Sequence, residues 1–378
     1  MKRGKYMWAF TALIIILYVA ALLVIRVGSP ARVQRDTYNQ WRQSYVIQED
    51  EQHAFVNTSN NKSKAVALSE GQGYGMYLTA IAGSKGWAQQ QDFDNLLRYY
   101  LEHRDYLGEQ QTIPTYLMQW RQYKEGQTWV SQDSSATDGD LYIAFSLYRA
   151  SKVWPKRSSY YLEIERQLTA DILSYEYNST THTLTVGNWA NQDSTYYNLM
   201  RSSDVMPDFF EAFYESTHDK RWLTVSNTML DRLVDLSNAH STGLIPDFAW
   251  ITDDGAKAVQ GKAVASKHDG DYSSNACRVP LMLATSDNPR AKKVMKKLLQ
   301  FFNQQDFITA GYSLSGKPLN DYQSNSFTAP LAFAAEQQQQ QHADRLLKNR
   351  QTILTEKLET NNYYDATLTT MAVMGEVD

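Results

Sequence analysis

The chain has 378 residues, enough for one large domain or two ordinary ones, and 43% of them are hydrophobic, as expected of a globular protein with a sizeable core. Its formal net charge of -4 excludes a strong basic patch, so we expect no nucleic-acid partner. The single cysteine, Cys277, excludes an internal disulfide and a thiolate metal cluster.

The first feature along the chain is a continuous apolar run, residues 7–25, which follows three basic residues. About 20 apolar residues span a bilayer, and basic residues stay on the cytoplasmic side. We therefore predict a cytoplasmic tail at 1–6, a signal anchor at 7–25 and a single-pass protein of the cell membrane with its catalytic domain outside. A cleaved signal peptide is the alternative, since small residues follow at 28–31. The run is longer than the usual ~7 to 15 residues, and Arg26 interrupts the approach to a cleavage site.

A short polar linker is predicted at 26–36, and one domain at 37–378, because no Pro/Gly/Ser-rich segment divides the body. Apolar residues recur at helical spacing in most of this domain. The one strand-like stretch is "THTLTVGNW" at 181–189, which we expect to be a hairpin arm. About a dozen helices without sequence repeats indicate a toroid of helical hairpins. Helical stripes cover 74–81, 92–104, 139–154, 159–175, 206–216, 220–237, 276–285, 290–304, 328–358 and 363–375.

The first helical stripe begins in "VALSEGQGYGMYLTAIAG", residues 66–83, where Glu70 precedes three glycines. A dinucleotide fingerprint would need G-x-G-x-x-G after a buried strand, but the glycines here are spaced G-x-G-x-G after a polar segment. No P-loop lysine follows them. The stretch therefore predicts an acid at a helix start, with glycines that let a ligand approach closely. Taken alone, Glu70 is equally well explained as part of a helix cap.

A second acidic pair lies in "ATDGDLYIAFSLYRASKVW", residues 136–154. Asp138 and Asp140 are two residues apart and do not share a helix face. One of them can cap the helix while the other points toward a cleft. Acids at a helix start are more often capping residues than catalytic ones.

These two stretches together resemble glycoside hydrolase family 8, the inverting endoglucanase, chitosanase and xylanase family. The A-T-D-G-D and I-A-x-S-L motifs of 136–154 resemble the family signature, and "SEGQGYGM" resembles its general-acid segment. "LMQW" at 117–120, "GLIPDFAW" at 243–250 and "YYDATLTTMA" at 363–372 are also similar to family segments. The resemblance covers about residues 37–375 and implies an all-α fold, an (α/α)6 barrel, without a cofactor or a catalytic metal.

By this resemblance, Glu70 is the general acid that protonates the glycosidic oxygen. Asp138 would bind the sugar at the cleavage subsite, and Trp120 would stack on a sugar ring. Tyr74, Asn275 and Arg278 fall in family segments and are predicted to contact the substrate. Inverting hydrolysis also needs a carboxylate base across the bond, about 6.5–9.5 Å from the acid.

Two departures from the family pattern concern that base. Many members carry it in a Y-D-A-x-R segment, and the matching stretch here, "YSSNACR", has Asn275 in its place. An amide cannot take a proton from water. The tyrosine of an N-P-S-Y-x-x-P segment is replaced by Asp204. We therefore expect a relocated base, with Asp247 first and Asp204 second; the remaining candidates are the loop acids Asp253, Asp254, Asp269 and Asp271.

Aromatic residues extend the predicted cleft. Trp189 and Trp250 are candidates for sugar binding, with Trp129 as a third, although such rings more often pack in a core.

The sequence thus predicts an inverting endo-acting glycosidase of a β-glucan-like polysaccharide or of the cell's own exopolysaccharide, with polysaccharide synthase machinery as a candidate partner. Two alternatives stay open: a non-catalytic glycan-binding accessory protein that has lost its base at Asn275, and a polysaccharide lyase.

Overall fold

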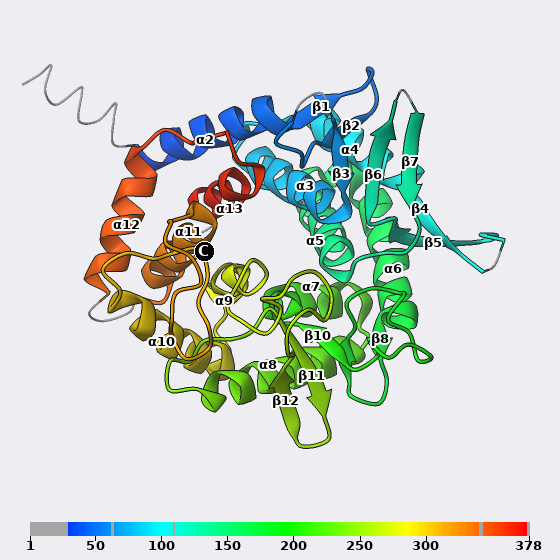
Figure 1. Cartoon of the computed structure of the whole chain (residues 1–378). Helices are drawn as coiled ribbons and strands as arrows, with labels where there is room; N and C mark the ends of the chain where they lie inside the picture. The colour runs from blue at the N-terminus through cyan, green and yellow to red at the C-terminus, as the bar shows by residue number, and fades with distance from the viewer. Residues whose placement is uncertain (1–28, 62–63, 109, 127, 340–342, 376–378) are drawn as a thin grey trace, which may run out of the picture.

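The fold of this computed structural model is a closed double ring of helices around a central axis (Figure 1). The structure describes residues 29–61, 64–108, 110–126, 128–339 and 343–375, and these contain twelve α-helices, α2 to α13. Inner and outer helices alternate along the chain. Each inner helix contacts the next, and α13 returns to contact α3, which closes the ring.

The inner helices are buried on nearly all sides. Gly73 and Gly75 of α3 and Gly139 of α5 allow this close approach, since an added Cβ would lie within 2.6 Å of a neighbouring atom at each position. The inner ring consists of α3 (Ser69–Ser84), α5 (Thr137–Val153), α7 (Pro207–Thr217), α9 (Val279–Leu283), α11 (Asn325–Gln337) and α13 (Tyr363–Met374).

The outer helices bury one face only, as their amphipathic sequences predict. In α10 (Pro289–Asn303) the buried residues follow helical spacing: Ala291, Val294, Met295, Leu298, Leu299 and Phe302. Asn288 caps this helix by accepting a bond from the backbone N–H of Arg290 at 2.9 Å. The other outer helices are α2 (Pro30–Tyr45), α4 (Gln90–Glu102), α6 (Ser158–Tyr175), α8 (Arg221–Ala239) and α12 (Asp344–Thr355).

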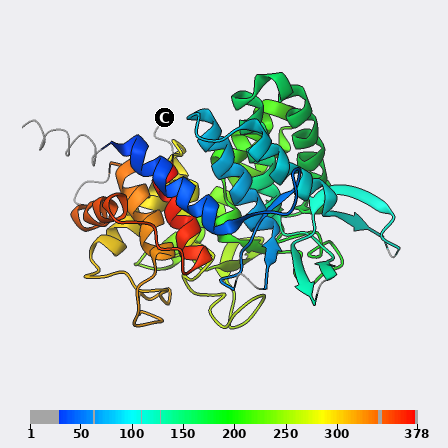
Figure 2. The same ribbon diagram turned by 90° about the horizontal axis from the view of Figure 1, so that it is seen from above.

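Short antiparallel strands and long loops gather at one end of the double ring (Figure 2). The strands form five small sheets: β1 (Val46–Gln48) with β2 (Ala54–Val56); β3 (Val66–Leu68) with β6 (Arg121–Glu125) and β7 (Thr128–Gln132); β4 (Arg104–Leu107) with β5 (Ile113–Met118); β8 (Tyr177–Asn178) with β9 (Thr183–Leu184); and β10 (Leu199–Arg201) with β11 (Phe248–Thr252) and β12 (Gly255–Ala258). Strand β3 leads directly into α3, so the sheet of β3, β6 and β7 fixes the start of the helix that carries Glu70.

Most predicted helices are confirmed to within three residues at each end. The predicted hairpin arm in 181–189 contains only the two-residue strand β9, which pairs with β8. Three predictions are corrected. The helix α2 begins at Pro30, inside the predicted linker. The stripe 328–358 is two helices, α11 and α12, because α11 ends at Gln337, in a run of glutamines that offers no apolar residue to pack against the core. The described residues also contain more strands than predicted, four of them in 104–132, and most strands are too short to show a clear alternation.

The predicted anchor at 7–25 lies outside the described residues. Among the helices that are described, none combines the length and the apolar character that crossing a membrane requires.

Candidate active site

The first turns of the inner helices meet at the end of the ring where the strands lie, and Glu70 stands among them. Its Oε1 accepts a hydrogen bond from the Tyr74 hydroxyl at 3.0 Å and contacts Nη1 of Arg278. The same Nη1 lies 3.0 Å from the Tyr74 oxygen. Tyr74 and Arg278 are buried, whereas the Glu70 side chain keeps 18% of its surface exposed. The Glu70 carboxyl is therefore held rigidly by the buried side chains of Tyr74 and Arg278, and part of it still reaches the surface.

Asp138, the predicted sugar-binding residue, lies beside Glu70. Its Oδ2 is 3.0 Å from Nη1 of Arg278 and 2.8 Å from Nη1 of Arg201. Two buried guanidinium groups thus converge on one carboxylate. The sequence did not predict Arg201 as a site residue. The one feature that could have indicated it is its position in "RSSD", three residues before the unusual Asp204.

Glycines bring α3 and α5 into direct backbone contact at this point. A Cβ on Gly139 would lie 2.7 Å from the backbone nitrogen of Glu70, and one on Gly73 would lie 2.6 Å from Cβ of Tyr142. On Gly71 and Gly75 it would meet side chains of the core. The prediction that the α3 glycines clear space for a ligand is therefore wrong: they clear space for neighbouring parts of the protein, which fixes Glu70 against Asp138.

Asp140, the second acid of the signature, points into the protein rather than toward the cleft. Its Oδ1 accepts the backbone N–H of Met118 at 2.8 Å, and Glu176 lies beside it, bonded to the Ser135 hydroxyl. Burial raises the pKa of Glu176 to about 7 and, together with the Glu176 charge, raises the pKa of Asp140. This pair ties α5 to β5 and to the end of α6 behind the site.

Asp204 is fully enclosed. Its two oxygens lie 3.3 and 3.4 Å from Nη1 of Arg201, and only 1% of the residue is exposed. Burial raises its pKa to about 8, although the Arg201 charge opposes this shift. Met206, not Asp204, occupies the cap position of α7. Through these two contacts Asp204 orients Arg201 toward Asp138.

Asp247 is also enclosed, at 1% exposure, and it organises the start of α9. Its Oδ1 accepts the backbone N–H groups of Ser273 at 3.0 Å and Ala276 at 2.7 Å. Burial raises its pKa to about 7, against the effect of these bonds. Asn275 lies between Asp247 and Arg278: its amide nitrogen is 3.4 Å from Asp247 Oδ2, and its oxygen accepts from Nη2 of Arg278 at 2.6 Å. Asn275 therefore positions the guanidinium that holds Glu70.

The loop acids have different surroundings. Asp253 and Asp254 form the two-residue turn between β11 and β12, away from the helix starts. Asp269 is buried and accepts four backbone N–H groups of residues 263–266, so its oxygens are fully used. Asp271 is different, because its side chain is 26% exposed and, within the described part of the chain, bonds to His268 alone, at 2.9 Å on Oδ2. Its backbone oxygen accepts the N–H of Asp247, which fixes the loop just before Asn275.

Aromatic residues flank the site on two sides. Trp120 is half-buried, and its backbone oxygen accepts the N–H of Ser69, so it adjoins Glu70 directly. Trp189 is 38% exposed and packs edge-on against Tyr196 at 5.3 Å; Tyr196 in turn stacks on Trp250 at 6.2 Å. Trp129 instead packs against Phe55 at the edge of the core.

Glu70 thus presents a partly exposed carboxyl beside the buried, paired carboxylate of Asp138. Aromatic rings, of which Trp189 is exposed, lie nearby at the mouth of the helical ring. This combination defines a carbohydrate-active site.

The comparisons assign the chain to a family of such enzymes. Residues 11–377 match Glycosyl hydrolases family 8, and the chain belongs to this family. It is 30% identical over 311 residues to a beta-glucanase of Niallia circulans, covering 79% of this chain and 73% of the relative. It is 28% identical to an endoglucanase of Bacillus sp. strain KSM-330, covering 79% and 66%.

Solved structures share the fold. The apo structure of a beta-1,3-1,4-glucanase from Paenibacillus sp. X4 superposes with a TM-score of 0.78 at 26% identity, covering 91% of each chain. The endo-beta-1,4-glucanase CMCax from Acetobacter xylinum gives 0.68 at 22% identity, covering 92% of this chain and 98% of that one. The family match and the glucanase relatives together make the chain a glycosidase that hydrolyses O-glycosyl bonds.

Proposed function

We propose that this enzyme cleaves a β-glucan-like polysaccharide internally and with inversion, with Glu70 as the general acid. The observation that carries this proposal is the convergence of Glu70 and Asp138 on Arg278 at the joined starts of α3 and α5. Glu70 has the exposure that a proton donor to a glycosidic oxygen requires. Asp138, held by the guanidinium groups of Arg201 and Arg278, would bind the hydroxyl groups of the sugar at the cleavage point.

For the general base we propose Asp271, one of the loop acids that the sequence left as candidates after Asp247 and Asp204. A base must touch a water molecule in the cleft, and Asp204 and Asp247 are each only 1% exposed. Asp269 is also only 1% exposed and both of its oxygens accept backbone N–H groups, whereas Asp271 leaves its Oδ1 without a donor among the described residues. Glu70 would donate its proton to the departing oxygen, while Asp271 takes a proton from the water that attacks the anomeric carbon.

With Asp271 as the base, the asparagine at position 275 is no longer a reason to expect a non-catalytic accessory protein, because the base does not need to stand there. Asn275 serves Arg278 instead.

The test is reducing-sugar release from mixed-linkage β-glucan, carboxymethylcellulose, xylan and chitosan, compared with the Glu70→Gln variant. We expect release from the β-glucans, a ~10²–10⁴-fold lower rate in the variant, and α-anomers as the first products by proton NMR. Products of β-configuration, or equal rates in the variant, would refute the mechanism.

We further propose that residues 7–25 hold the enzyme in the cell membrane, with the domain outside, where it trims an exopolysaccharide made by a neighbouring synthase. The apolar run after three basic residues supports the anchor. The named activities of the relatives support a glucan substrate. Protease treatment of intact cells should degrade the domain; full protection of the domain would contradict this topology.

A further inference from the structure

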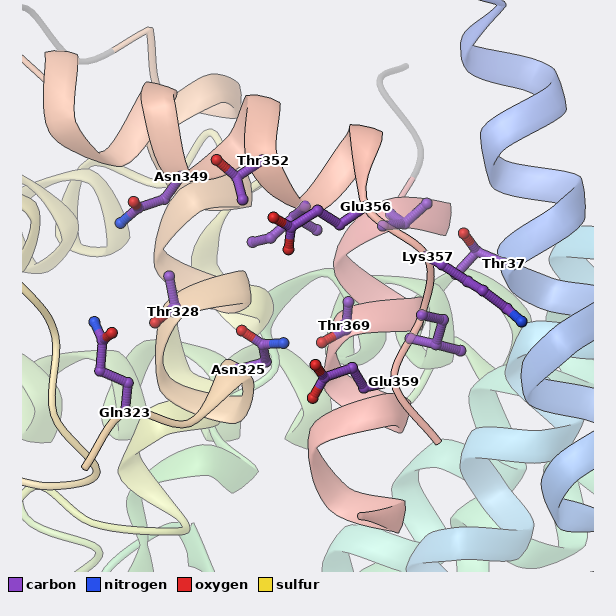
Figure 3. Close-up of a pocket in the computed structure, with 13 residues that line it drawn as sticks. Thr37, Gln323, Asn325, Thr328, Asn349, Thr352, Glu356, Lys357, Glu359 and Thr369 are labelled. Atoms are coloured by element: carbon purple, nitrogen blue, oxygen red, sulfur yellow. The ribbon is translucent and has the colours of Figure 1, made fainter. Parts of the chain in front are cut away.

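A second hollow lies outside the catalytic site, in the wall of the ring between α2, α11, α12 and α13 (Figure 3). Its volume is about 200 Å³. None of the residues of the active site described above lines it. It belongs to the seam between the inner and outer layers, where most positions of this fold are filled by apolar side chains.

The hollow exists because α12 packs against the inner ring mainly through its middle. Leu346 and Arg350 are its only buried residues. Arg350 ties the helix to its neighbours, with Nε 2.8 Å from Glu336 of α11 and Nη1 2.8 Å from the Ala372 oxygen of α13. Beyond this anchor point, Thr352 and Glu356 line the space above α11 and α13 without filling it.

The walls of the hollow are hydrogen-bonding groups. Thr369 of α13 is 93% buried, and its hydroxyl has no hydrogen-bond partner among the residues that the structure describes. Figure 3 shows Thr369, Asn325 and Glu359 pointing toward one another, from α13, from the start of α11 and from the segment before α13. A buried hydroxyl without a partner is rare in a native protein, and here it faces a space large enough for a ligand.

The mixture of groups fits a neutral polyhydroxylated ligand. Amides and threonine hydroxyls both donate and accept, and the carboxylates of Glu356 and Glu359 accept from vicinal hydroxyls. Leu358 and Val373 supply an apolar patch for the C–H face of a ring. The hollow, at about 200 Å³, is far larger than the ~10–15 Å³ that a single water molecule needs on the same measure, so it has room for a small ligand such as a sugar ring.

We propose that this hollow is a non-catalytic binding site for one sugar unit of a polysaccharide chain. It would hold the polymer on the outer wall while another part of the chain lies in the catalytic cleft. The proposal does not depend on which residue is the general base. A divalent cation fits less well, because the described residues contain no cluster of three metal-ligating side chains of the Asp, Glu, His or Cys type.

The test is affinity electrophoresis of the full-length chain in detergent, through gels that contain mixed-linkage β-glucan. All proteins carry Glu70→Gln, so that the polymer is not cleaved. Thr369→Val, which keeps the shape and removes the hydroxyl, and Asn325→Ala should each weaken retardation threefold or more. Thr355→Val is the matched control: this exposed residue lies on α12 but does not line the hollow, and it should change retardation by less than 1.5-fold. With Glu70 restored, all three variants should hydrolyse cellotetraose at the parent rate, because the catalytic site is intact.

Retardation of Thr369→Val equal to that of the parent overturns the proposal. Binding of calcium alone also overturns the proposal. This outcome is shown if Ca²⁺ raises the thermal midpoint of the parent but not that of Glu359→Gln, while glucan retardation is unchanged. If the parent hydrolyses no glycan and Thr369→Val still weakens retardation, the catalytic proposal fails and the sugar site stands.

Discussion

Replacing Gly139 by alanine tests how closely catalysis depends on the contact between α3 and α5. The new Cβ would lie 2.3 Å from Oγ of Ser69 and 2.7 Å from the backbone nitrogen of Glu70. An ordinary contact is at least 3.4 Å, so the backbone at Glu70 must move by about 0.7 Å. The serine hydroxyl can rotate away, but the backbone atom cannot.

Two opposing effects set the stability of this variant. Alanine is better than glycine in a helix interior by ~0.5–1 kcal/mol, whereas overpacking in a tight core costs ~1–3 kcal/mol. We expect a net loss of about 1 kcal/mol and a thermal midpoint lower by a few degrees. The effect on catalysis is larger, because a shift of ~1 Å in a catalytic group can cost ~10²-fold. We expect kcat on β-glucan to fall ~10- to 100-fold.

The matched control is Gly86→Ala, in the turn after α3. Gly86 has φ of +74° and no atom within 4 Å of an added Cβ, so the change strains the backbone without displacing a neighbour. It should cost ~1–2 kcal/mol of stability and leave kcat unchanged. Circular dichroism melts and initial rates of reducing-sugar release on both variants separate the two effects. A folded Gly139→Ala enzyme with kcat within twofold of the parent would refute the reasoning.

Three further predictions concern the surroundings of the site. Arg278→Lys should lower kcat at least ~10²-fold in a folded protein, since one ammonium cannot replace a guanidinium that holds Glu70, Asp138 and Asn275 together; near-parent kcat would contradict this. Glu176→Gln should flatten the dependence of the thermal midpoint on pH. The pKa of Glu176 is raised from 4.5 to about 7 in the folded protein. Its contribution to the stability of the fold is therefore complete below pH 4.5 and is lost as the pH rises through 7. Parallel curves of thermal midpoint against pH for the parent and the variant, between about pH 4.5 and 8, would exclude this contribution. Trp189→Ala should raise KM for β-glucan ~5-fold with little change in kcat, because a stacking ring contributes on the order of 1 kcal/mol to binding; a change confined to kcat would argue against a sugar platform.

The sequence predicted the ring of helices and the acid half of the site. Apolar spacing identified most of the helices, because each presents at least one apolar face to the core. Glu70 and Asp138 were found because they stand in long motifs. The structure brings them together, since the inner helices begin at one end of the ring.

The partners of these acids could not be predicted, because they depend on contacts between distant segments. Arg201 reaches Asp138 from β10, and the separation of buried from exposed acids depends on how the 240–275 segment folds. The local sequence around Asp247 resembles that of a catalytic residue, yet backbone N–H groups of Ser273 and Ala276 enclose it. Asp271 has an ordinary local sequence, and only its exposure distinguishes it from Asp269.

The measurement that tests the central claim most directly is chemical rescue of Asp271→Asn by sodium azide. Azide attacks an anomeric carbon without needing a base, so it replaces the activated water. With Asp271 as the base, the variant should lose ~10²-fold or more in kcat on β-glucan, and azide should restore bond cleavage with an α-glycosyl azide as the product. Asp247→Asn should show no such rescue. An Asp271→Asn enzyme that keeps most of its activity, or azide rescue of Asp247→Asn instead, would contradict the account.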